Sequence, residues 1–141
     1  MAERPLSNEE RQAIARAEAV IAGLTGQYLA AAEADLARLK VAAASLAADP
    51  AGRTSHLDRL FQISHDMKGQ GATFGYPLVT TIGNRLCRFI EKRRDTMDDA
   101  GVAVVLRHVE ALDRVIGERM KEPATPEAEA LIESLELAAG G

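Results

Sequence analysis

The chain has 141 residues, which is the length of one domain. Hydrophobic residues make up 47% of it but aromatic residues only 4%, so the core must be mainly aliphatic, which favours helices. Seventeen Lys and Arg against 21 Asp and Glu give a net charge of −4, which argues against a broad nucleic-acid-binding face. The single cysteine, Cys87, allows neither an internal disulfide nor a thiolate metal cage, and we expect it to be buried as a small hydrophobe.

The N-terminal segment MAERPLSNEERQ is charged, and no run of about 18 uncharged apolar residues occurs, so neither a signal peptide nor a membrane span is visible in the sequence. We therefore expect a cytoplasmic protein that does not bind membranes.

Two helices are predicted before the first proline-containing turn. Ser7 and Glu10 have the spacing of a capping box, which predicts a helical N-terminal extension over residues 7–22, and Gly23 and Gly26 mark its end or a bend. A second helix is predicted from residue 27, because apolar residues there recur at steps of three and four: Leu29, Ala32, Leu36, Leu39, Ala43 and Leu46.

The third helix is predicted to follow a turn at residues 49–52, which includes a proline. Ser55, with Asp58 three residues on, indicates its N-terminal cap. We expect this helix to run to about Phe74 and to end at Gly75.

Two further helices complete a predicted bundle core over residues 27–120. The fourth begins at Pro77 and ends in the polar stretch KRRDTMDD, and its expected apolar face is Leu78, Ile82, Leu86 and Phe89. The fifth runs from about Asp99 to about Met120, with a stripe of Val102, Val105, Val109, Leu112 and Ile116. A short C-terminal helix is expected over residues 127–138. The sequence thus predicts one all-α domain over residues 1–141, an antiparallel four-helix bundle with helical additions at its ends.

The third helix has two different faces. Projected at about 100° per residue, the buried stripe should contain Leu57, Leu60, Ser64, Met67, Gly71 and Phe74. His65 lies about 130° from the centre of this stripe, so its imidazole should face solvent. Its expected neighbours on that face are Asp58, Phe61, Lys68, Gly69 and Ala72.

The two glycines near His65 need a physical reason, because each costs about 0.8–1.0 kcal/mol relative to alanine inside a helix. Gly71 should face the core and permit close packing, whereas Gly69 should face outward and let another molecule's backbone approach the imidazole. A neutral imidazole can act as a nucleophile, and Lys68, one turn away, could neutralise a phosphoryl group that His65 accepts.

The segment HDMKGQGATFG, residues 65–75, resembles the motif of the histidine-containing phosphotransfer (HPt) domain of bacterial two-component phosphorelays. It departs at Gln70, where a Ser or Ala is common, and LCRFIE at residues 86–91 resembles the next helix of that family. The resemblance implies a phosphocarrier in which His65 is phosphorylated on Nε2, Lys68 steadies the phosphate and Gly69 makes room for the partner. Met67, Gly71, Phe74 and Gly75 would be structural.

The implied partner is the receiver domain of a response regulator or hybrid histidine kinase, docking near Phe61, Gly69 and Ala72. Mg²⁺ would be held only by the receiver, and this chain would need no cofactor or metal of its own. A monomer is expected. Because no ATP-binding domain fits beside the bundle, the chain is not expected to phosphorylate itself.

Other interpretations remain open. The same face could belong to a non-catalytic helical adaptor, and the phosphoacceptor region of a histidine kinase is a rival, although Gly69 and Gln70 replace its usual Thr or Asn and Pro. We expect His56 to lie at a frayed helix start and His108 on the surface. The basic run Arg85, Arg88, Arg93 and Arg94 is most simply a solvated helix face, and electrostatic steering of an acidic partner is the alternative.

Overall fold

The computed structural model describes residues 4–140, and the regular structure in that range is entirely helical, which confirms the predicted all-α class. Five α-helices follow one another along the chain: α1 (Asn8–Ala48), α2 (Arg53–Gly71), α3 (Pro77–Arg93), α4 (Asp99–Gly117) and α5 (Pro126–Gly140). Three short 3₁₀ turns connect the first four: Pro50–Gly52, Ala72–Phe74 and Arg94–Thr96.

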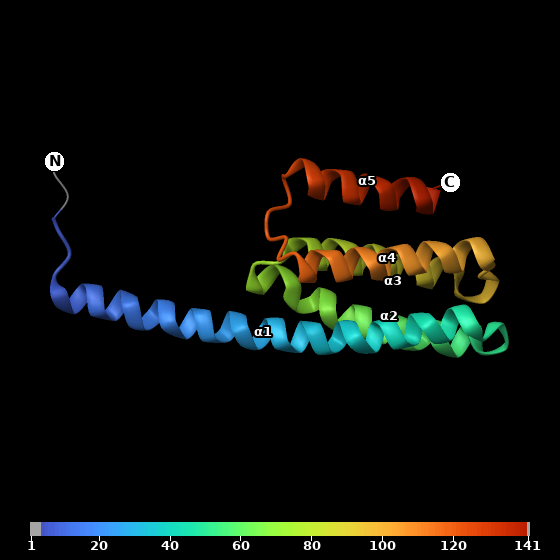
Figure 1. The fold of residues 1–141 in the computed structure, drawn as a ribbon, viewed down its shortest axis with the longest axis horizontal. Coiled ribbons are helices and arrows are strands. Elements are labelled where there is room, and N and C mark those ends of the chain that lie inside the picture. Colours follow the sequence, from blue (N-terminus) through green and yellow to red (C-terminus); the bar gives the residue numbers. More distant parts are fainter. Residues whose placement is uncertain (1–3, 141) are drawn as a thin grey trace.

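The C-terminal half of α1 packs with α2, α3 and α4 into a ring of four helices. α1 contacts α2 and α4, and α3 contacts the same two helices from the other side (Figure 1). α5 packs outside this ring, mainly on α4. Because each of the four helices contributes its apolar face to one shared core, the predicted stripes of α3 and α4 are buried.

The first helix differs from the prediction. Its start is as expected, since the Ser7 hydroxyl accepts the Glu10 backbone N–H at 3.1 Å, but the helix does not end near residue 22. It continues through Gly23 and Gly26 as a single element of 41 residues. Two isolated glycines lower the stability of a helix without ending it when strong helix formers flank them. The predicted division into an extension and a second helix is therefore wrong.

The consequence is a helical arm, residues 8–27 of α1, that projects past the other helices (Figure 1). Nearly all of its residues are exposed, and burial begins at Tyr28. From there the expected stripe is buried through Ala32, Leu36, Leu39, Ala43 and Leu46, with Leu29 only partly covered.

The start of α2 also differs from the prediction. The helix begins at Arg53, whose backbone N–H donates to the Pro50 carbonyl, so the 3₁₀ turn passes directly into α2 and Ser55 is not the cap. Asp58 instead accepts two hydrogen bonds from the Arg94 guanidinium, at 2.5 and 2.8 Å, which lowers the pKa of its carboxyl. Across residues 4–140, no helix is both long enough and apolar enough to span a bilayer.

Candidate functional site

His65 lies on the outer face of α2, as its position in the sequence predicts. Its side chain is 56% exposed, whereas Ser64 and Met67 on the opposite face are buried. The Phe61 ring, one turn earlier, lies 5.9 Å from the imidazole, centroid to centroid, with 30° between the planes. This half-buried ring supports one side of the imidazole and leaves its edge open to solvent.

The two nitrogens of His65 have different surroundings. Nδ1 is 4.0 Å from Oδ1 of Asp66, too far for a hydrogen bond but close enough for attraction between the carboxylate and a proton on that nitrogen. A proton on Nδ1 gives the tautomer in which Nε2 is the ring atom with a free lone pair.

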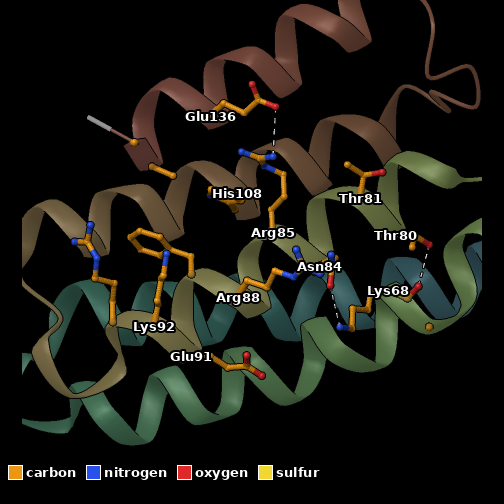
Figure 2. A pocket seen from close by; sticks show the side chains of 15 residues that line it. Lys68, Thr80, Thr81, Asn84, Arg85, Arg88, Glu91, Lys92, His108 and Glu136 are labelled. Carbon is orange, nitrogen blue, oxygen red and sulfur yellow. Dashed lines mark hydrogen bonds and ion pairs between the residues drawn. The ribbon is translucent and has the colours of Figure 1, made fainter.

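Lys68 is held beside this face by α3. Its ammonium donates to Oδ1 of Asn84 at 3.2 Å, and its backbone carbonyl accepts the Thr80 hydroxyl at 2.9 Å (Figure 2). The same hydroxyl oxygen accepts the Ala72 backbone N–H at 2.8 Å. Thr80 thus satisfies two backbone groups at the end of α2, and Asn84 limits where the ammonium can go.

The glycines on the two faces of α2 have opposite surroundings. A Cβ on Gly69 would meet nothing within 4 Å, so the backbone beside His65 is open. A Cβ on Gly71 would lie 2.8 Å from Oγ1 of Thr80 and 2.9 Å from the Tyr76 carbonyl oxygen. Gly71 is therefore required for α2 and α3 to approach each other, and the assignment of one glycine to each face is confirmed.

Close packing of α3 extends to the lysine itself. A Cβ on Gly83 would lie 2.9 Å from the Cβ of Lys68 and 3.4 Å from the Ser64 carbonyl oxygen. The backbone of α3 therefore lies directly against the stem of Lys68, and the glycine at position 83 leaves the room for this approach.

The remaining motif residues take the positions expected of them. Met67 is buried, Phe74 stacks on Tyr28 with ring centroids 5.0 Å apart, and Gly75 has φ 87°, a left-handed conformation that glycine adopts without strain. Ala72 is exposed on the same side of the molecule as Gly69. The buried Met67, the Phe74–Tyr28 stack and the left-handed Gly75 together hold the C-terminal end of α2 against the bundle. His65 lies two residues before Met67 and is therefore held in place with this end of the helix.

A groove runs from Lys68 and Gly69 along α3 to α5, and basic side chains line it (Figure 2). Arg85 is paired with Glu136 of α5 at 3.4 Å. Arg88 and Lys92 also line the groove, and neither is within ion-pair distance of a carboxylate among the described residues. The lining has five basic side chains, Lys68, Arg85, Arg88, Lys92 and Arg93, against two acidic ones, Glu91 and Glu136. The groove therefore carries positive charge beside the imidazole face.

The predicted basic run does not form one free face. Arg94 pairs with Asp58, and the Arg93 guanidinium lies over the Phe89 ring, 5.2 Å from its centroid. Only part of the run, with Lys92, borders the groove.

The other two histidines have structural surroundings. The His56 ring is 3.0 Å from the Asp49 carboxylate, which lowers the pKa of Asp49 and links the connecting turn to α2. His108 is 1% exposed, stacks on Phe89 and hydrogen-bonds the Val104 carbonyl at 2.8 Å, so its predicted surface position is wrong. Burial lowers its pKa. His108 follows Val105 by three residues and precedes Leu112 by four, so helical periodicity already places it at the edge of the α4 stripe, and the surface prediction overlooked this spacing.

Asn84 and Thr80 are the site residues that the sequence did not indicate. They stand four residues apart and so share a face of α3, but the sequence does not say that this face meets the end of α2. Cys87 is buried, as expected.

Comparisons with protein-family models, curated proteins and solved structures found no match to this chain. A functional assignment therefore rests on the geometry and chemistry of its own residues.

Proposed function

We propose that the protein is a histidine phosphotransfer protein, which accepts a phosphoryl group on His65 and exchanges it with an aspartate of a receiver domain. The observation that carries the proposal is the combination at one face of α2: an exposed imidazole, an ammonium held by Asn84, and open backbone at Gly69. Each feature has a role in transfer between two protein surfaces.

The transfer step is a displacement at phosphorus. The Nε2 lone pair attacks the phosphorus of the receiver's aspartyl phosphate, the N–P bond forms, and the acyl O–P bond breaks to return the carboxylate. The proton on Nδ1 stays near Asp66, 4.0 Å away. Because phosphohistidine and aspartyl phosphate are both high-energy species, the same step runs in reverse, and the Mg²⁺ that offsets phosphate charge would be bound by the receiver.

Lys68 supplies the positive charge on this side of the phosphoryl group. Its ammonium gains a strong acceptor when a phosphoryl group sits on His65, because Lys68 follows His65 by three residues, about one helical turn. In the absence of a phosphoryl group the ammonium is held by Asn84. Phosphoryl transfer depends mainly on positioning and charge compensation, so few other groups are needed.

The surface around His65 suits a protein partner. Gly69 and Ala72 are small and exposed, so a partner can approach closely, and Phe61 offers an apolar contact. The basic groove with Arg88 and Lys92 would attract an acidic receiver pocket. Association should therefore be transient and should weaken as ionic strength rises.

The test is phosphorylation by a small donor, phosphoramidate, and by a phosphorylated receiver domain. A phosphoryl label that is stable in base and lost in acid should appear on the wild type and on His56→Gln, but not on His65→Gln. His56→Gln is the matched control because it removes a histidine of the same helix. A label retained in His65→Gln would refute the proposal. Partner binding that is unchanged in His65→Gln, with no label in the wild type, would instead favour an adaptor.

A further inference from the structure

The helical arm, residues 8–27, carries a stripe of apolar side chains that the described part of the chain does not cover. Ile14, Ala17, Ile21 and Leu24 recur at alternating steps of three and four, the spacing of a coiled-coil seam. The exposed fractions of the larger members are 44% for Ile14, 61% for Ile21 and 48% for Leu24. The stripe leads directly into Tyr28, where burial in the bundle begins.

The arm's charge argues against a membrane surface as its partner. Helices that lie on membranes carry Lys and Arg on their polar face, whereas this arm has three glutamates, Glu9, Glu10 and Glu18, against Arg11 and Arg16. A protein helix with a matching apolar stripe is the better occupant.

We propose that the arms of two copies of this chain pair antiparallel to form a homodimer. About a twofold axis near residue 19, Ile14 of one copy packs against Leu24 of the other and Ala17 against Ile21, so the two seams match over their whole length. Val20, 62% exposed beside the seam, then meets Val20 of the second copy across the axis. All four large apolar side chains of the arm are covered in this arrangement.

The length of the arm and the charges at its ends fit the same arrangement. Antiparallel pairing brings the first turn of one arm to Tyr28 of the other copy, where the bundle begins. The Tyr76 ring lies 5.7 Å from the Tyr28 ring, and the Lys121 ammonium lies 5.6 Å from the Tyr76 centroid. In the proposed pairing, Glu9 in the first turn of one arm lies at the end of the second bundle where Lys121 is found, so the two opposite charges attract.

One contact in the antiparallel pairing is unfavourable, and it allows the antiparallel and parallel arrangements to be distinguished. Glu18 lies beside the seam near the twofold axis, so the two copies of this carboxylate face each other. In a parallel pairing, Glu18 would instead lie near Ala13 of the second copy. Removing its charge should strengthen the antiparallel dimer and leave a parallel one unchanged.

This proposal replaces the monomer expected from the sequence. The continuous α1 carries its uncovered apolar stripe beyond the end of the bundle, which the sequence did not indicate.

The first test is sedimentation equilibrium of the full chain from about 1 µM to 1 mM. We expect the mass of a dimer at the upper end. Ile21→Glu should weaken association about 100-fold or more, because each dimer loses two buried side chains. The matched control is Val41→Glu, which replaces an equally exposed side chain, also 61%, on α1 outside the arm, and it should change nothing. A wild type that is monomeric at 1 mM, or equal weakening by both variants, would overturn the proposal.

The second test addresses orientation. At low salt, Glu18→Gln should bind about twofold tighter. Lys121→Glu should weaken the dimer, and adding Glu9→Lys should restore it. Oxidation of mixed Ile14→Cys and Leu24→Cys chains should give mainly the mixed disulfide; mainly Ile14→Cys homodimers would overturn the antiparallel arrangement. Helicity by circular dichroism that matches the wild type shows that each variant folds.

Discussion

Gly69 and Gly71, two residues apart in the last turn of α2, should respond in opposite ways to the same substitution. Gly69→Ala adds a methyl group where nothing lies within 4 Å, so only the gain in helix propensity applies. That gain is about 0.8–1.0 kcal/mol inside a helix, and we expect about half of it or more near the helix end. The free energy of unfolding should therefore rise by roughly 0.5–1 kcal/mol.

Gly71→Ala has the same propensity gain and a larger steric penalty. The new methyl would lie 2.8 Å from Oγ1 and 3.0 Å from the backbone N of Thr80, and 2.9 Å from the Tyr76 carbonyl oxygen. Two of these three atoms belong to the backbone, so the conflict is relieved only by moving α3 away from α2. Overpacking of this kind costs about 1–3 kcal/mol, and loss of the Thr80 hydrogen bonds adds to it. We expect a net loss of roughly 1–3 kcal/mol.

Urea denaturation followed by circular dichroism at 222 nm measures both values, and it suits a chain without tryptophan. The difference between the two variants should be about 2–4 kcal/mol. Gly71→Ala as stable as the wild type, or Gly69→Ala less stable than it, would refute the reasoning from the two faces of α2.

A larger side chain at position 69 should affect transfer to a partner without lowering the stability of the fold. Gly69→Leu should be at least as stable as the wild type, by up to about 0.5–1 kcal/mol, because the side chain extends into solvent and leucine, like alanine, is a better helix former than glycine. It should still be phosphorylated by phosphoramidate but should exchange phosphate with a receiver domain far more slowly. Equal receiver transfer by Gly69→Leu would show that the partner does not approach this backbone.

Two further predictions concern the neighbours of the site. Asn84→Ala removes the acceptor that holds Lys68, so phosphotransfer should slow about threefold to tenfold in stopped-flow or quench-flow assays. Asn84→Asp keeps an acceptor oxygen and should transfer at close to the wild-type rate. Equal slowing in both variants would contradict this role of Asn84. Burial lowers the pKa of His108, so the unfolded chain binds a proton near its ordinary pKa of about 6.5 that the folded chain does not. Its contribution to stability is therefore present above about pH 6.5 and is lost as pH falls further. Unfolding free energies from pH 7 to 5 should fall more steeply for the wild type than for His108→Leu, and parallel curves would contradict the assignment.

The limits of sequence reasoning follow from what each signal measures. Apolar periodicity locates a buried face, and it correctly placed Ser64 and Met67 inward and His65 outward. It does not report which side chains meet across two helices, so the Lys68–Asn84 contact was not predictable. His108 was misplaced for a different reason: it stands three and four residues from Val105 and Leu112, at the edge of the α4 stripe, and the predicted buried face was drawn too narrow to include it.

Glycine predicted the structure correctly where a close contact or a turn required it, and it predicted a false helix end where neither was present. Gly71 is crowded by α3, and Gly75 needs a left-handed conformation, so both were interpreted correctly. Gly23 and Gly26 have no neighbour within 4 Å, and there the only effect is a helix-propensity cost of about 1 kcal/mol each, too small to end a helix of 41 residues. A lone glycine therefore predicts a boundary only when a turn or a close contact accompanies it.

The arm and the phosphoacceptor face depend on one shared junction. Tyr28, at the base of the arm, stacks on Phe74, which follows the end of α2, so the direction of the arm and the end of the helix that carries His65 are fixed by the same aromatic contact. In the proposed dimer the two bundles begin 18 residues apart along the paired arms, about 27 Å at the rise of an α-helix. Each His65 then lies on its own bundle and outside the seam. The two proposals are consequently independent: an arm variant that abolishes dimers leaves the phosphoacceptor face intact, and a change at His65 leaves the seam intact.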